Sequence, residues 1–277
     1  MGLLVGLGPA SAVGGGGNSG GKPGGGEEGA QLIAYSADDA TMTAVGSIEL
    51  GYSTDLTRFF NSMKNLKKVG LFDTSKVQTF TYMFEYSGIQ ELPDFDYSEG
   101  LSFSGYLSGC SSLVSVPPMS LPKATSVSSM FSSCQKLEHV EIKCPCATIL
   151  TSMFNNCYAL KSVRLEPGAV TSIRNAFIGC AALETIENIL DVSATTTTTY
   201  AFKDCTALVN CDLRGLCTGI SFEFSPALSK DSVLFLFENA KTVTTAQTIT
   251  LHADVFGQLT DVEIAVATGK GFSVVSA

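Results

Sequence analysis

Histidine, tryptophan and basic residues are scarce in this sequence. The chain has two His, no Trp, and 17 Lys and Arg against 26 Asp and Glu, which gives a formal net charge of −9. Two imidazoles leave little material for histidine-based catalysis or a histidine-rich metal site. Binding to phosphates needs clustered cations, and the only compact basic group is Lys64, Lys67 and Lys68. We therefore expect no nucleic-acid partner.

Recognisable catalytic motifs are also missing. The sequence shows no Ser/His/acid order and no H-E-x-x-H pair, and the Gly run that begins at Gly14 lacks the Lys-Ser/Thr of a phosphate loop. Thiol chemistry is the remaining enzymatic alternative, because nine Cys are present. We expect a non-enzymatic protein with no cofactor and no resident metal.

The N-terminal stretch differs in composition from the rest of the chain. Residues 1–13 are apolar but short, and they contain Gly and Pro without a basic flank, which favours neither an export signal nor a membrane-spanning helix. Residues 14–29 are Gly-rich, as in a flexible linker. One interpretation is a peptide that docks on other virion proteins through Leu3, Leu4, Val5 and Leu7. The alternative is a frayed chain end.

The rest of the 277-residue chain, which is 45% hydrophobic overall, contains an internal repeat. The unit is F-x-x-C-x-x-L-x-x-V-x-L, clearest from Phe131 through Cys134, Leu137 and Val140 to Ile142. The Phe position recurs 23 to 25 residues apart, at residues 60, 84, 107, 131, 154, 177 and 202. This period lies in the range of leucine-rich repeats.

Each unit switches its hydrophobic period. The part that ends at Cys and Leu has helical or turn-like spacing, and the tail alternates as a strand does. We predict an α/β repeat solenoid over residues 55–220, right-handed, with about seven repeats of parallel strands and short helices. Its Phe, Cys and Leu positions would form buried ladders. Residues 30–54 would form an N-terminal cap.

An α/β cap is expected over residues 221–277. Ser229 would cap a helix that starts in K-D-S-V-L-F-L-F, Thr248–Leu251 would be a strand, and Thr260 with Glu263 forms a capping box for a second helix. Gly269 and Gly271 suit its exit before a last strand from Phe272 to Val275.

The repeats resemble those of BspA-like bacterial leucine-rich-repeat surface proteins. The segment from Ile173 through Ala176, Phe177 and Cys180 to Ile186 carries this likeness most clearly, and Ser129-Met130-Phe131 is similar to an S-x-M-F variant. The likeness covers about residues 55–215 and implies a binding role of unspecified kind. The segment from Ser229 to Val275 also resembles the ends of repeat proteins encoded by phages and prophages of gut bacteria.

Residues that alternate with the buried strand positions should face outward and are candidates for ligand binding. An ordinary solvent-exposed face has the same composition, so the alternative is that these residues bind no ligand. Tyrosines near the Phe-to-Cys turns are the aromatic alternative: Tyr86, Tyr106, Tyr158 and Tyr200. The outward strand candidates are His139, Glu141, Arg164, Glu166, Glu187, Asp212 and Arg214.

The Cys column formed by residues 110, 134, 157, 180 and 205 is expected to hold buried free thiols, because Met63 and Ser87 fill the same slot in sister repeats. Cys144-x-Cys146 with His139 is the weaker, metal-binding alternative. The Thr run from Thr195 to Thr199 is expected to be an exposed connection.

Two functions fit these features. The first is a bacteriophage virion component, a tail or fibre-like adhesin that contacts a protein or glycan on the bacterial surface through its repeats. The second is an adhesin on the bacterial cell surface. Neither requires a membrane-spanning segment in the chain.

Overall fold

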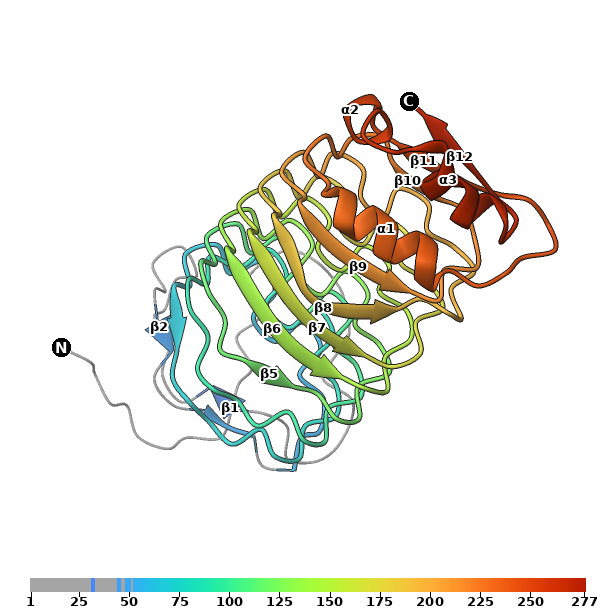
Figure 1. Ribbon diagram of the computed structural model, residues 1–277. Coiled ribbons are helices and arrows are strands. Elements are labelled where there is room, and N and C mark those ends of the chain that lie inside the picture. Colours follow the sequence, from blue (N-terminus) through green and yellow to red (C-terminus); the bar gives the residue numbers. More distant parts are fainter. Residues whose placement is uncertain (1–30, 33–43, 46–47, 51) are drawn as a thin grey trace.

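The computed structural model describes residues 31–32, 44–45, 48–50 and 52–277. Successive repeats lie on one another as coils, and one wall of the stack is a five-stranded parallel sheet (Figure 1). Val140, Val163, Ile186 and Cys211 form one register row of that sheet, so one repeat adds one strand. The strands of this sheet are β5 (Met119–Ser120), β6 (His139–Cys144), β7 (Ser162–Pro167), β8 (Thr185–Asp191) and β9 (Asn210–Arg214).

A second wall joins the same repeats through single parallel bridges. One series runs from Asp55 through Thr79 and Ser102 to Ser126, and another runs from Ile149 through Ser172 to Thr197. The expected parallel repeat fold is present. The described residues before residue 70 include four short strands, with β1 antiparallel to β3 and β2 parallel to β4. They are β1 (Gln31–Leu32), β2 (Ala44–Val45), β3 (Ile48–Glu49) and β4 (Lys68–Val69).

The short helices predicted inside the repeats are wrong: the described residues from 52 to 229 contain turns instead. Asn155 N–H donates to the Ser152 carbonyl, three residues back, while Ser152 N–H donates to Arg174 in the next repeat. Ser152 and Asn156 both have a positive φ, of 55° and 58°. A helix needs every N–H for its own i−4 carbonyl. Here alternate N–H groups are taken by the neighbouring repeat.

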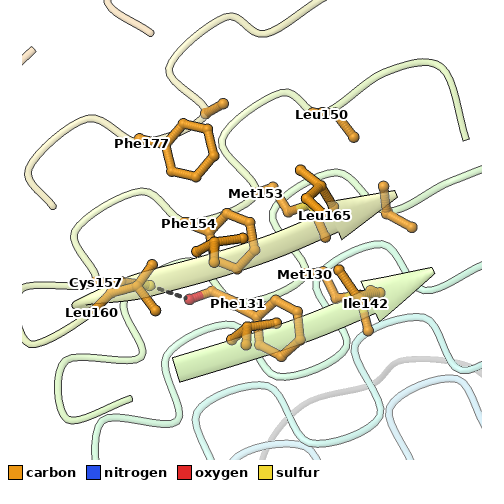
Figure 2. Close-up of a cluster of buried hydrophobic side chains, with 14 of the residues drawn as sticks. Met130, Phe131, Ile142, Leu150, Met153, Phe154, Cys157, Leu160, Leu165 and Phe177 are labelled. Atoms are coloured by element: carbon orange, nitrogen blue, oxygen red, sulfur yellow. Dashed lines mark hydrogen bonds between the residues drawn. The ribbon is translucent and has the colours of Figure 1, made fainter. Parts of the chain in front are cut away.

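Aromatic rings fill the core at the repeated Phe position. Phe154 is fully buried, as predicted, and its ring centroid lies 5.4 Å from those of both Phe131 and Phe177, with nearly parallel planes (Figure 2). The stack continues through Phe202 to Phe222, which sequence analysis did not include in the ladder. Phe222 ends strand β10, which spans the expected boundary between residues 220 and 221.

The Cys column is a ladder of hydrogen-bond donors. All five of its cysteines are buried and free, as predicted. The Cys157 thiol donates to the Phe131 carbonyl oxygen, 3.0 Å away in the preceding repeat (Figure 2). The Cys180 thiol does the same to the carbonyl oxygen of Phe154. The slot therefore favours a small apolar side chain that still carries a donor, and cysteine satisfies both conditions.

The C-terminal segment forms the predicted α/β arrangement. Strands β10 (Ile220–Phe222), β11 (Gln247–Leu251) and β12 (Phe272–Ser276) form a parallel sheet in that order. Helix α1 (Lys230–Asn239) has the expected Ser229 cap, and α3 (Asp261–Thr268) has the expected capping box. Helix α2 (Ala253–Phe256) was not predicted.

Most of the predictions about the N-terminus concern residues that the structure does not describe. The docking peptide 1–13, with Leu3, Leu4, Val5 and Leu7, lies outside the described residues, as do the linker 14–29 and most of the cap at 30–54. Among the residues that the structure does describe, no helix is long and apolar enough to cross a membrane.

Candidate functional site

The parallel register brings five of the seven predicted strand residues onto one exposed face. Arg164 of β7 lies between two carboxylates, with nitrogen–oxygen distances of 3.9 Å to Glu141 on β6 and 3.2 Å to Glu166 on its own strand. His139 Nδ1 lies 2.6 Å from the Ser162 hydroxyl and 3.5 Å from the carboxylate of Glu187 on β8. The sixth member is Lys143, 3.7 Å from Glu166. We call these residues the charged patch: His139, Glu141, Lys143, Arg164, Glu166 and Glu187.

Lys143 was absent from the sequence-based candidates although the same alternation predicts it. It follows buried Ile142 on β6, just as Glu141 precedes it. The pattern that identified its neighbours was therefore sufficient to find it.

The ion pairs of the charged patch contribute little to folding stability. Their side chains are between a third and just over half exposed. Exposed pairs of this kind are typically worth between zero and about 1 kcal/mol, because water screens the attraction and ordering the side chains costs entropy. A binding partner can exchange these weak internal pairs for pairs of its own. Three carboxylates against Lys143 and Arg164 leave the patch close to electrical balance when His139 is neutral.

A bulge in β8 separates the charged patch from the C-terminal end of the sheet. The register shifts between Ile186 and Leu190, and the Asn188 side chain occupies the gap. Its Oδ1 accepts from the Leu165 N–H at 2.9 Å and its Nδ2 donates to the Leu165 carbonyl at 2.7 Å. Ile189 is consequently 46% exposed. The bulge was not predicted, although Leu190 comes four positions after Ile186 whereas Leu165 comes two positions after Val163.

Asp212, one of the predicted ligand residues, is hydrogen-bonded to helix α1 instead of joining the charged patch. Its carboxylate accepts a hydrogen bond from the Ser232 hydroxyl at 2.9 Å, and that hydroxyl accepts from the Cys211 N–H at 3.1 Å. Helix α1 thus covers the open edge of β9, and Asp212 helps to fasten it there. Arg214 is exposed but lies apart from the charged patch, paired with Asp191 at 3.1 Å.

The four candidate tyrosines separate into two groups. Tyr86, Tyr158 and Tyr200 are each about half exposed. Tyr106 is fully buried, so its predicted place among surface aromatics is wrong. Its hydroxyl lies 3.0 Å from that of Tyr97, and burial raises the pKa of Tyr106 well above the ordinary value of tyrosine.

The Cys144 and Cys146 thiols do not converge with His139. Cys144 is buried, and burial raises its pKa to about 12. Cys146 is exposed, and its thiol donates to the Pro122 carbonyl oxygen at 3.2 Å. In the described part of the chain, no group of three or more His, Cys, Asp and Glu side chains is placed to hold a metal ion.

The Thr run is not a simple exposed connection. Thr195 and Thr198 are buried and donate their hydroxyl protons to the carbonyl oxygens of Val170 and Gly219. Residues 196–199 of the run line an open groove with a volume of about 500 Å³. Tyr200 lies at its edge. We call this hollow the Thr groove.

Comparison with protein families finds two partial matches. Residues 125–225 match the BspA type leucine rich repeat region, in six copies. Residues 35–144 match a family described as Mycoplasma protein of unknown function, DUF285. Each match covers less than half of the chain, and neither reaches residues 226–277, so the likeness of that segment to phage-encoded proteins has no support. No curated protein matches the chain.

Proposed function

We propose that this protein is a non-enzymatic, adhesin-type binding protein of a bacterial cell surface, which contacts a partner protein through the charged patch. The proposal treats the stacked coils as a solenoid of about seven repeats that serves as a rigid scaffold. The similarity to BspA type repeats supports a surface binding role, and the virion alternative has no such support.

The observation that carries the proposal is the position of the charged patch on the sheet. Glu141, Arg164 and Glu187 project from three neighbouring strands that are held in register by backbone hydrogen bonds. Side chains on such a frame are placed before the partner arrives, which reduces the entropy lost on binding. Exposed Ile189 adds an apolar contact on the same strand as Glu187.

Reversal of one ion pair tests the proposal. In the double variant Glu141→Arg and Arg164→Glu, both charges remain and can still attract each other. Glu166 loses its pair with Arg164, but an exposed pair of this kind contributes at most about 1 kcal/mol, so we expect the chain to remain folded. Binding to the partner should fall at least tenfold, because like charges now face each other across the interface. Suitable probes are purified extracellular-matrix and host-cell surface proteins on a biosensor chip.

A matched control is available on the same sheet. Glu138 and Lys161 are an exposed pair 2.7 Å apart that does not belong to the charged patch. Exchanging these two residues should leave binding within about twofold. Equal loss of binding in both exchanges, or labelling of the protein exclusively inside intact source cells, would contradict the proposal.

The virion alternative makes a separate prediction. Under it, deletion of residues 1–29 would leave the melting temperature unchanged and would abolish incorporation into a particle. Fractionation of virions followed by mass spectrometry distinguishes the two locations directly.

A further inference from the structure

The Thr groove forms where the repeat pattern ends. It lies on the wall built from single bridges, to which Thr197 belongs through its bridge to Ser172, and not on the β5–β9 sheet. The row of single bridges ends at Thr197, and β10 and β11 lie beyond it. Three segments line the groove: residues 196–200, residues 218–221 with Glu223, and β11 through Gln247, Thr248 and Thr250.

Hydroxyl groups dominate the groove lining. The Thr248 and Thr250 hydroxyls have no protein hydrogen-bond partner within the described residues, so both are free to donate and to accept. Gln247 is held in place, because its Oε1 accepts from the Gly219 N–H at 2.9 Å. Glu223 adds a carboxylate with no ion-pair partner in the described part of the chain. The lining therefore offers donors and acceptors together.

Tyr200 adds an aromatic ring to this polar lining. It is 56% exposed, and the Lys203 ammonium lies 5.3 Å from its ring centroid and 5.7 Å from that of Phe224. This cation–π contact favours the observed orientation of the ring. A tyrosine ring presents an apolar face to a ligand while its hydroxyl remains available to water or a polar group.

The lining composition excludes other ligand classes. Within the part of the chain that the structure describes, no Lys or Arg lines the groove, so it lacks the cations that a phosphate or a nucleic acid requires. Among the same residues, the one aliphatic side chain of the lining is Ile220, which is buried, so the groove offers a lipid chain no apolar surface. The volume of about 500 Å³ lies within the range of small-molecule sites.

We propose that the Thr groove binds a neutral oligosaccharide. Sugars combine apolar C–H faces, which stack on an aromatic ring, with hydroxyls that donate and accept. Tyr200 would contact a C–H face, and Thr248, Thr250 and Glu223 would bind hydroxyls. This site is independent of the charged patch, so its test does not depend on the proposed protein partner.

The test uses the full chain on an array of immobilised oligosaccharides, both neutral and acidic, followed by titration of each ligand that binds. We expect neutral oligosaccharides to bind. Tyr200→Asn should weaken binding about tenfold through loss of the stacking contact. Asn is suitable because Asn175 adopts the same positive φ one repeat earlier. Thr248→Val, which removes one hydroxyl at constant volume, should weaken binding about fivefold.

A closely matched control is Tyr86→Asn. Tyr86 has the same exposed fraction of 56% and a φ of 57° against 54° for Tyr200, but it does not line the groove. We expect the Tyr86→Asn variant to bind neutral oligosaccharides as tightly as the unmodified chain does. The exchange of Glu141 and Arg164 should also leave oligosaccharide binding unchanged. Absence of binding to every neutral oligosaccharide, or equal losses in Tyr86→Asn and Tyr200→Asn, would overturn the proposal.

Discussion

Truncation of Phe154 tests the aromatic ladder in the core. The ring is fully buried and stacked on both faces, with Phe131 and Phe177 each 5.4 Å away. Phe154→Ala would therefore remove two ring contacts and leave a cavity at the centre of the stack. The neighbouring rings cannot readily close it, because hydrogen bonds on both walls fix the spacing between coils.

The expected cost is about 4 to 5 kcal/mol, the upper part of the range for removal of a buried Phe side chain. Stacked aromatic pairs add about 0.5 to 1.5 kcal/mol beyond the burial of their area, which places a doubly stacked ring near that upper limit. Phe154→Leu should cost only about 1 to 2 kcal/mol, since Leu fills most of the volume. Leu107 already occupies the same position in another repeat.

Urea unfolding followed by far-UV circular dichroism measures both costs. Tyr158→Ala is the control, because this side chain is about half exposed. Its cost should stay within about 0.5 kcal/mol. If Phe154→Ala destabilised the protein no more than this control, or if Leu and Ala were equally costly, stacking at the Phe position would not stabilise the core as argued.

Three other perturbations have defined outcomes. In the native protein, the Cys column should label slowly with a thiol reagent and fully after denaturation, because burial raises the pKa of Cys157 to about 12; rapid native labelling would contradict this. Gly105→Ala should cost about 1 to 3 kcal/mol in urea unfolding, because Gly105 has a φ of 60° and an added Cβ would lie 2.3 Å from the Tyr82 ring. The hydrogen bond from Lys230, together with further bonds to Thr260, lowers the pKa of Glu263 from 4.5 to about 2. The ionised Glu263 carboxylate therefore stabilises the fold fully above pH 4.5, and this stabilisation is lost as the pH falls toward 2. In the Glu263→Gln variant, the melting temperature should change less with pH over that interval.

The ladders were predictable because they depend on spacing along the sequence. A period of 23 to 25 residues places Phe131, Phe154 and Phe177 in the same position of successive coils whatever the local backbone does. The helix-capping residues of the C-terminal segment were predictable for a different reason. Thr260 and Glu263 satisfy each other's backbone groups within one turn, so no distant residue is needed.

The turns of the repeats were not predictable in the same way. Apolar residues three apart suit both a short helix and a series of tight turns, so the hydrophobic pattern does not distinguish them. The difference lies in partners one repeat away, such as the carbonyl of Arg174, which accepts from Ser152. Positive φ values at Ser152 and Asn156 are compatible with those bonds and incompatible with a continuous helix.

Alternation identified which strand residues face outward but not what covers them. Asp212 satisfies the outward pattern as well as Glu141 does, yet Ser232 of α1 binds its carboxylate. Tyr106 directly precedes the Phe position, as buried Met130 and Met153 do in later repeats, and it packs in an aromatic cluster with Phe80 and Phe103. The deciding contact for Asp212 comes from another segment of the chain, whereas the burial of Tyr106 could have been predicted from its place in the repeat.

The two proposed sites depend on opposite properties of a repeat fold. Each coil contacts only its neighbours, so regular repetition produces flat faces with one side chain per coil in each row. The charged patch uses that regularity, because a flat face suits a broad protein contact. A groove needs an interruption, and the Thr groove lies where the row of single bridges ends at Thr197 and β10 and β11 follow. Insertion of a further repeat unit before β10 should therefore close the Thr groove while leaving the charged patch unchanged.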